Sequence, residues 1–143
     1  MADRVDTLVA VLEAALAEGP ALSLAVLFGS SARGHAHADS DVDLAILPVD
    51  PELPLHAELV LQATLERACG RSVHLVRLDY ASTVLKWEVA RQGIMVFARS
   101  RRDQVRFVAQ AALEHADLAS TLARAGAVFR DRVQASVGRT EAR

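Results

Sequence analysis

Apolar residues along the chain fall into short runs that are separated by longer segments of mixed character. Two runs are almost uninterrupted, Leu22 to Phe28 and, after an acidic start, Asp41 to Leu47. Short runs rich in Val, Ile, Leu and Phe are typical of strands that are buried on both faces. Two more runs, Ser72 to Leu78 and Ile94 to Ala98, predict two further strands.

The segments between these runs have the spacing of amphipathic helices. Val9, Leu12 and Leu16, for example, form one apolar stripe. The expected helices are Asp6 to Glu18, a segment that follows the Pro51 to Pro54 loop and continues through Cys69, and Ala81 to Gln92. Helices that alternate with short strands predict a sheet domain of the α/β or α+β class.

The pattern and the charge both change after Ser100. The chain has 13 acidic and 8 basic residues through residue 100, but 5 acidic and 8 basic residues from residue 101 onward. A helix from Arg101 to Val133 would be about 50 Å long, against roughly 30 Å for a small domain. Its first half could pack on its own sheet, whereas its second half is expected to contact another chain. The apolar stripe of this helix repeats at three and four residues and consists of Val105, Val108, Ala112, His115, Ala119, Leu122, Phe129 and Val133.

Length and composition indicate one compact domain with a helical extension. The 143 residues are 52% hydrophobic, which argues against a disordered chain. Because there is no long apolar run and no signal-peptide pattern, we expect a cytoplasmic protein without a membrane contact. A net charge of −2 and only 4% aromatic residues argue against direct nucleic-acid binding. We therefore expect a domain at residues 1–100 and a partner-binding extension at 101–143.

The loop between the first two strands carries the clearest chemistry. Gly29 and Ser30 end the first run, and Asp41 and Asp43 begin the second. Alternation along a strand places both carboxylates on one face, where they repel each other unless a cation such as Mg²⁺ or Mn²⁺ lies between them. A glycine lets the backbone approach a ligand, and amides that open a short helix attract phosphate. The loop predicts a metal-nucleotide site, although a strand start with solvated acids has the same local pattern.

Further positions make this pattern specific. The loop reads G-S-x-x-R-G, then a variable segment, then S-D-x-D-L, with Gly29, Ser30, Arg33, Gly34, Ser40, Asp41, Asp43 and Leu44 at the fixed positions. It resembles the signature of the minimal nucleotidyltransferases of the DNA polymerase beta superfamily. The segments at 71–76 and 89–93, followed by a long helix, extend the likeness over nearly the whole chain. They make it similar to the MNT-type antitoxins that pair with HEPN-domain RNases.

The resemblance implies a fold, a site and a partner. The fold would be the polymerase-beta-like nucleotidyltransferase fold, a small mixed sheet with helices on one face, plus a long C-terminal helix. In these antitoxins AMP is transferred from ATP to a tyrosine hydroxyl of the toxin, so ATP is the implied substrate and a HEPN-type toxin the implied partner in a hetero-oligomer. The implied site residues are Gly29, Ser30, Arg33 and Ser40 for the nucleotide, and Asp41 and Asp43 for Mg²⁺ or Mn²⁺.

One position departs from the family pattern. A third acidic residue usually comes from the next strand, and here that position is His74. Neutral imidazole can bind Mn²⁺, Zn²⁺ or Ni²⁺ or act as a base, but it cannot bridge two Mg²⁺ ions as a carboxylate does. An exposed strand histidine without a role fits the sequence as well. Asp79 is a poor substitute because it lies on the opposite alternation face, and His35 and His37 are expected to face solvent.

Two classes of function therefore stay open. The first is an enzyme that transfers AMP to its toxin, with His74 joining Asp41 and Asp43 as a catalytic residue. The second is an antitoxin with a weakened site that neutralises the toxin by binding through its helical extension. Transfer to a small molecule such as an aminoglycoside is less favoured, because little chain is left to build a substrate pocket.

Overall fold

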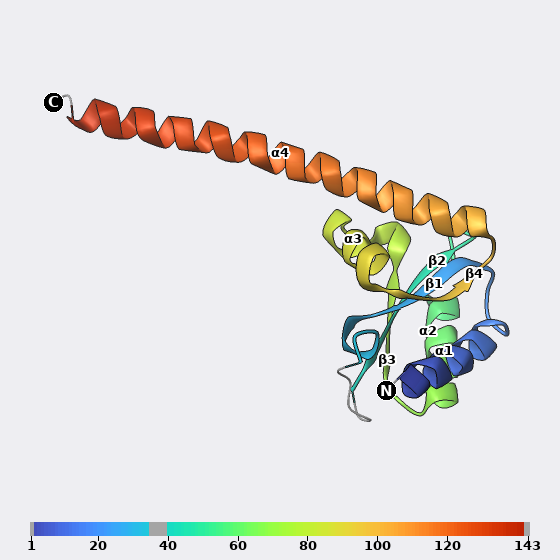
Figure 1. The fold of residues 1–143 in the computed structure, drawn as a ribbon. Coiled ribbons are helices and arrows are strands. Elements are labelled where there is room, and N and C mark those ends of the chain that lie inside the picture. Colours follow the sequence, from blue (N-terminus) through green and yellow to red (C-terminus); the bar gives the residue numbers. More distant parts are fainter. Residues whose placement is uncertain (1, 35–39, 142–143) are drawn as a thin grey trace.

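One sheet of four strands organises the protein, whose computed structural model describes residues 2–34 and 40–141. The strand order is β3-β2-β1-β4 (Figure 1). β1 is antiparallel to β2 and β4, whereas β2 and β3 run parallel, so the sheet is mixed as the family resemblance implied. The strands are β1 (Leu22–Phe28), β2 (Val42–Pro48), β3 (Val73–Arg77) and β4 (Ile94–Ala98).

Helices cover the two faces of the sheet unequally. α1 (Ala2–Leu16) and α2 (Leu55–Cys69) pack on one face, and α3 (Thr83–Gln92) and the start of α4 (Arg101–Glu141) pack on the other (Figure 1). The predicted fold class is confirmed, but helices lie on both faces of the sheet and not on one face as the resemblance implied. The core under α1 and α2 includes Leu12, Leu16, Leu61, Leu65, Val42, Leu44 and Ile46.

Side-chain alternation along β2 explains both cores. Leu44 and Ile46 point into the core under α1 and α2, whereas Ala45 contributes to the core under α3. Asp43 is two residues before Ala45, so it belongs to the face that α3 covers only in part. The end of β2 that carries the acidic residues is therefore left open for a ligand.

α4 leaves the domain after its first turns. Its 41 residues make it about 60 Å long, and its outer half extends beyond α3 without covering any other element (Figure 1). Phe107 packs in the core on the second face of the sheet, and Ala111 one turn later is also buried. The rings of Trp87 and His115 stack with centroids 4.7 Å apart. No helix within residues 2–34 and 40–141 is long and apolar enough to cross a membrane.

The face of α4 that packs on the domain differs from the predicted stripe. Val105 and Val108 are exposed, and the buried positions are Phe107 and Ala111 instead. Val108 lies about 100° around the helix from Phe107, because neighbouring residues on a helix are about 100° apart. His115 is the stripe residue that contacts α3. Most of the stripe is therefore left free, in the first half of the helix as well as in the second.

Candidate active site

Three strands bring the predicted catalytic residues together. In the register of the sheet, Phe28 at the end of β1 lies opposite Asp43 of β2, and Asp43 lies opposite His74 of β3. Gly29 and Ser30 follow Phe28 directly, as the start of a three-residue 3₁₀ helix at Gly29–Ser31. The predicted turn, carboxylate and histidine are therefore neighbours at one end of the sheet.

Gly29 is the residue that allows the turn to approach the carboxylate. Its φ is 72°, a conformation that residues with a side chain rarely adopt. A Cβ atom at this position would collide with the Oδ2 atom of Asp43. Glycine is thus required here for two reasons, the backbone conformation and the space that the carboxylate occupies.

Asp43 and His74 form a polar pair. The Nδ1 atom of His74 lies 3.2 Å from Oδ1 of Asp43, and the side chains are 68% and 30% exposed, respectively. An ionised carboxylate can only accept a hydrogen bond, so the pair requires the proton of a neutral imidazole to be on Nδ1. The Nε2 atom of His74 is then left as a hydrogen-bond acceptor on an exposed ring. His74 therefore contacts Asp43 across the two strands.

Asp41 lies just before β2 and is exposed. Its backbone is held by two residues that the sequence did not identify. The Nε and Nη2 atoms of Arg71 donate to the carbonyl oxygen of Ser40 at 3.0 and 2.8 Å. The hydroxyl of Ser31 lies 3.5 Å from the carbonyl oxygen of Asp41. Neither residue could be found from spacing, because both act through backbone carbonyls far from them in the sequence.

The other predicted residues are placed less specifically. Arg33 is exposed, and its side chain forms no hydrogen bond or ion pair with another described residue. Ser40 contacts Arg71 through its carbonyl oxygen. Asp79 pairs with Arg77, with Nη2 and Oδ2 2.6 Å apart, as expected for an acid outside the site. The predicted solvent-facing residues His35 and His37 lie outside the described residues.

The carboxylates fit a cation that a nucleotide also binds. Asp43 lies opposite the end of β1, and the backbone of Asp41 contacts Ser31 of the turn. Their carboxylates are hard oxygen ligands, the type that Mg²⁺ and Mn²⁺ prefer. Within residues 2–34 and 40–141, no group of three or more His, Cys, Asp or Glu side chains could hold a metal ion by itself. Further ligands would have to come from the phosphates of a nucleotide, which is the usual way in which Mg²⁺ is held at such sites.

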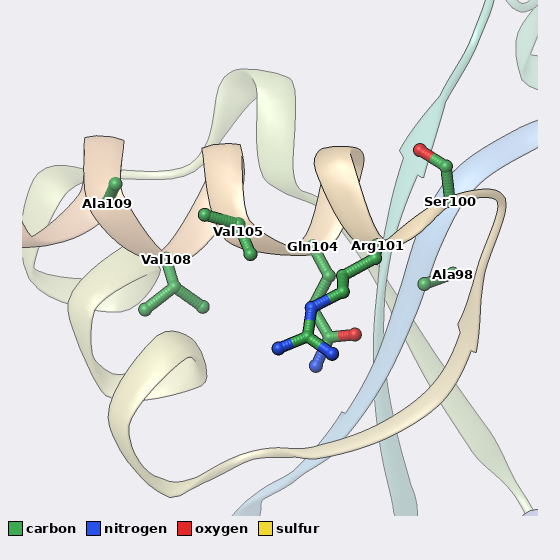
Figure 2. A pocket seen from close by; sticks show the side chains of 7 residues that line it. All are labelled: Ala98, Ser100, Arg101, Gln104, Val105, Val108 and Ala109. Atoms are coloured by element: carbon green, nitrogen blue, oxygen red, sulfur yellow. The ribbon is translucent and has the colours of Figure 1, made fainter.

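A separate hollow lies beside the start of α4. It has a volume of about 710 Å³, and the side chains of Val105 and Val108 lie along its helical side (Figure 2). Arg101 and Gln104 extend into the same region from the first turn of the helix (Figure 2). None of the predicted catalytic residues lines this hollow, so it is not the candidate active site.

Comparison with known sequences identifies the same region. Residues 11–102 match the family model described as Polymerase beta, Nucleotidyltransferase. The protein adenylyltransferase MntA of Shewanella oneidensis is 38% identical over 86 residues, which are 60% of this chain and 61% of MntA. The matched part thus spans about three-fifths of that relative. The family match at residues 11–102 includes Gly29, Asp43 and His74.

Solved structures resemble the chain over a greater length. A crystal structure of a toxin-antitoxin with AMP-PNP has a TM-score of 0.71 and 32% identity, and the match covers 85% of this chain and 98% of that chain. A structure of tri-AMPylated Shewanella oneidensis HEPN toxin in complex with MNT antitoxin has a TM-score of 0.61 and 28% identity. That match covers 87% of this chain and 95% of the other.

Proposed function

The chain belongs to the polymerase beta nucleotidyltransferase family, and from this premise we propose that it is an antitoxin that transfers AMP from ATP to a tyrosine hydroxyl of a HEPN-type toxin. The observation that carries the proposal is the junction of the Gly29 turn with Asp43 and His74. The similarity to MntA and to structures that contain an ATP analogue or an AMPylated toxin supports it. We place this function in the cytoplasm, where ATP and the toxin would be found.

Each site residue has a role in this proposal. Backbone amides of the Gly29 and Ser30 turn bind the triphosphate, because a glycine lets phosphate oxygens approach the chain. Asp41 and Asp43 hold Mg²⁺ or Mn²⁺, which would lower the charge on the reacting phosphate oxygens. Arg33 is exposed on the loop and neutralises part of the triphosphate charge. Ser40, which directly precedes Asp41, is assigned to the nucleotide by the family pattern.

The transfer itself replaces one bond to phosphorus by another. The toxin hydroxyl oxygen attacks the α-phosphorus of ATP, the bond from the α-phosphorus to the bridging oxygen breaks, and pyrophosphate leaves. The hydroxyl proton passes to Nε2 of His74, whose Nδ1–H is held by Asp43. Most of the remaining contribution of the protein is positioning, as is general for phosphoryl transfer.

The long helix α4 supplies the surface that binds the partner in this proposal. We assign residues 1–100 to the nucleotidyltransferase domain and residues 101–143 to an extension that binds the toxin. Leu122 and Phe129 are 62% and 68% exposed, although both belong to one apolar stripe. Apolar side chains that repeat at three and four residues on an exposed helix are typical of a helix-helix interface.

The two aspartates provide the direct test. A variant with Asp41→Asn and Asp43→Asn should transfer no label from α-³²P-ATP to the co-purified toxin, whereas the wild-type complex labels it in Mg²⁺ or Mn²⁺. The control is a variant with Asp6→Asn and Glu18→Gln, which loses the same charge from the exposed surface of the domain. Equal labelling by the aspartate variant and the wild type would contradict the assigned site.

His74 favours a second candidate function, neutralisation by binding alone, because a histidine replaces the usual third carboxylate. His74→Gln keeps a hydrogen-bond donor but removes the proton acceptor, so it should lower transfer by about 100-fold. His74→Asp should also lower AMP transfer, most clearly in Mn²⁺.

Two other outcomes would change this assignment. A rise in Mg²⁺-dependent transfer with His74→Asp would show that the missing carboxylate limits the enzyme. A wild type that never labels its toxin but still protects cells would support binding alone.

A further inference from the structure

Asp41 needs a support that its own strand does not provide. It is an exposed residue that precedes the first hydrogen-bonded residue of β2, Val42. A carboxylate that helps to bind a cation and a triphosphate has to stay in place relative to the turn that binds the phosphates. The peptide bonds on either side of Asp41 show how the chain achieves this.

Both of these peptide bonds have a hydrogen-bond donor on their carbonyl oxygen. The carbonyl of Ser40, which precedes Asp41, accepts two hydrogen bonds from the guanidinium of Arg71, at 3.0 Å from Nε and 2.8 Å from Nη2. The carbonyl of Asp41 itself lies 3.5 Å from the hydroxyl of Ser31. The amide of Val42 donates to Ser72 at 2.8 Å, so the next residue is already part of the sheet.

Ser31 connects this support to the phosphate-binding turn. It follows Ser30 in the chain and is only 3% exposed, the one buried polar residue within residues 2–34 and 40–141. Its hydroxyl oxygen also accepts a hydrogen bond from Nη2 of Arg71 at 3.3 Å. Arg71 therefore contacts the turn and the segment before Asp41 with the same side chain.

Arg71 is itself held in place at the start of the β3 segment. It follows Gly70, the left-handed cap of α2 with a φ of 68°. Its carbonyl oxygen lies 3.6 Å from the Sγ atom of Cys69. The backbone of Arg71 is thus held between the end of α2 and the start of β3, which restricts where its guanidinium can lie.

We propose that Arg71, together with Ser31, is a positioning residue that fixes Asp41 at a set distance from the Gly29 and Ser30 turn. In this role Arg71 acts through the carbonyl of Ser40 and not by direct contact with ATP or the toxin. The inference rests on the proposed function, because it assigns Asp41 to the binding of the metal and the triphosphate. It predicts that loss of Arg71 weakens nucleotide binding by a folded protein.

The experiment measures binding, so that it does not depend on catalysis. The full-length chain is titrated calorimetrically with AMP-PNP and Mg²⁺ as wild type, Arg71→Lys and Arg71→Met, at a temperature where circular dichroism shows each protein to be folded. Arg71→Met should weaken binding by about 10- to 100-fold, as losses of groups that orient metal ligands do. Arg71→Lys should fall between the two, because an ammonium cannot reproduce the two-pronged contact. The control is Arg67→Met, which removes an exposed arginine from α2.

A purely structural role of Arg71 gives different results. It would lower the unfolding temperature but leave binding by the folded Arg71→Met protein within about twofold of the wild type, and that result would overturn the inference. Should Arg71→Met not fold, Ser31→Ala tests the support on the other side of Asp41, with weaker binding expected and unchanged binding contradicting the proposal. Amide hydrogen exchange near Val42 should become faster in either variant.

The outcome is separable from that of the proposed function. A wild type that binds AMP-PNP and Mg²⁺ but never labels the toxin would contradict the AMP transfer only. Weaker binding by the Arg71→Met variant would then still support the positioning role.

Discussion

The two ends of this molecule hold their functional residues in opposite ways. At the sheet end, Asp43 contacts His74 and the Gly29 turn, and the peptide bonds around Asp41 are held by Arg71 and Ser31. At the helix end, the described side chains of α4 beyond residue 118 are exposed, except for the half-buried Gly126. One end is organised by its own chain, whereas the other has an apolar surface that its own chain does not cover.

The difference agrees with the function that we propose for each end. Nucleotidyl transfer needs groups that are in position before the substrate arrives, because reorganising them would add to the barrier. A surface that binds a partner needs only exposed apolar area and a rigid frame, which a long helix supplies. Changes at the sheet end should therefore affect catalysis within a stable complex, and changes at the helix end should affect the complex itself.

The largest expected effect is at Gly29. Gly29→Ala would put a methyl group where the Asp43 carboxylate lies, so the turn or the carboxylate must move, and AMP transfer should fall by at least about 100-fold. The control is Gly70→Ala, whose φ of 68° is equally unfavourable for alanine but whose Cβ would meet no atom within 4 Å. Both variants should lose about 1–2 kcal/mol of stability from the backbone conformation. The measurement pairs thermal unfolding with label transfer, and equal transfer by both variants would mean that the collision is unimportant.

A smaller effect is expected at the helix end. A variant with Leu122→Asp and Phe129→Asp should leave nucleotide binding unchanged but weaken toxin binding by about 30-fold or more, as the loss of central interface residues does. The control is Leu113→Asp with Val128→Asp, which adds the same charge to equally exposed apolar positions outside the stripe. Co-purification and surface plasmon resonance with the toxin check the prediction. Equal weakening by both variants would show that the stripe is not a defined interface.

Much of the sheet end could be predicted from the sequence. The turn at Gly29, the acids at Asp41 and Asp43 and the place of His74 follow from strand patterns, because alternation and register decide which side chains meet. The predicted ranges of β1 and β4 agree with the structure. The predicted end of α2 at Cys69 agrees too, and Gly70 follows it as a left-handed cap.

The supports of the site could not be predicted in the same way. The contact between Arg71 and Ser31 joins residues 40 positions apart in the sequence. It depends on the position of the end of α2 relative to the turn at Gly29–Ser31. The stripe in α4 also did not identify which side chains are buried, since Val105 and Val108 of the stripe are exposed and Phe107, outside the stripe, is buried. Periodicity finds an apolar stripe, but the position of α3 decides which face of the next helix is buried.

The smallest expected effect concerns the ion pair between Lys86 of α3 and Glu114 of α4. Nζ of Lys86 on α3 lies 2.7 Å from the Glu114 carboxylate on α4, and this hydrogen bond, although opposed by burial, holds the pKa of Glu114 below its ordinary value of 4.5. A carboxylate with a lowered pKa in the folded state contributes stability above its unfolded pKa and loses it as the pH falls through the folded value. The side chains are 23% and 32% exposed, so solvent screens the pair and its contribution should be only about 0.5 kcal/mol.

A double-mutant cycle isolates this contribution. Lys86→Met, Glu114→Gln and the double variant are unfolded with urea at pH 7 and at pH 3, and the coupling energy should be about 0.5 kcal/mol at pH 7 and near zero at pH 3. None of these three variants should change label transfer, because the Lys86–Glu114 ion pair is remote from the Gly29 turn. A loss of transfer in the Lys86→Met variant would mean that the two ends are coupled through α3, and the contrast between them would then have to be given up.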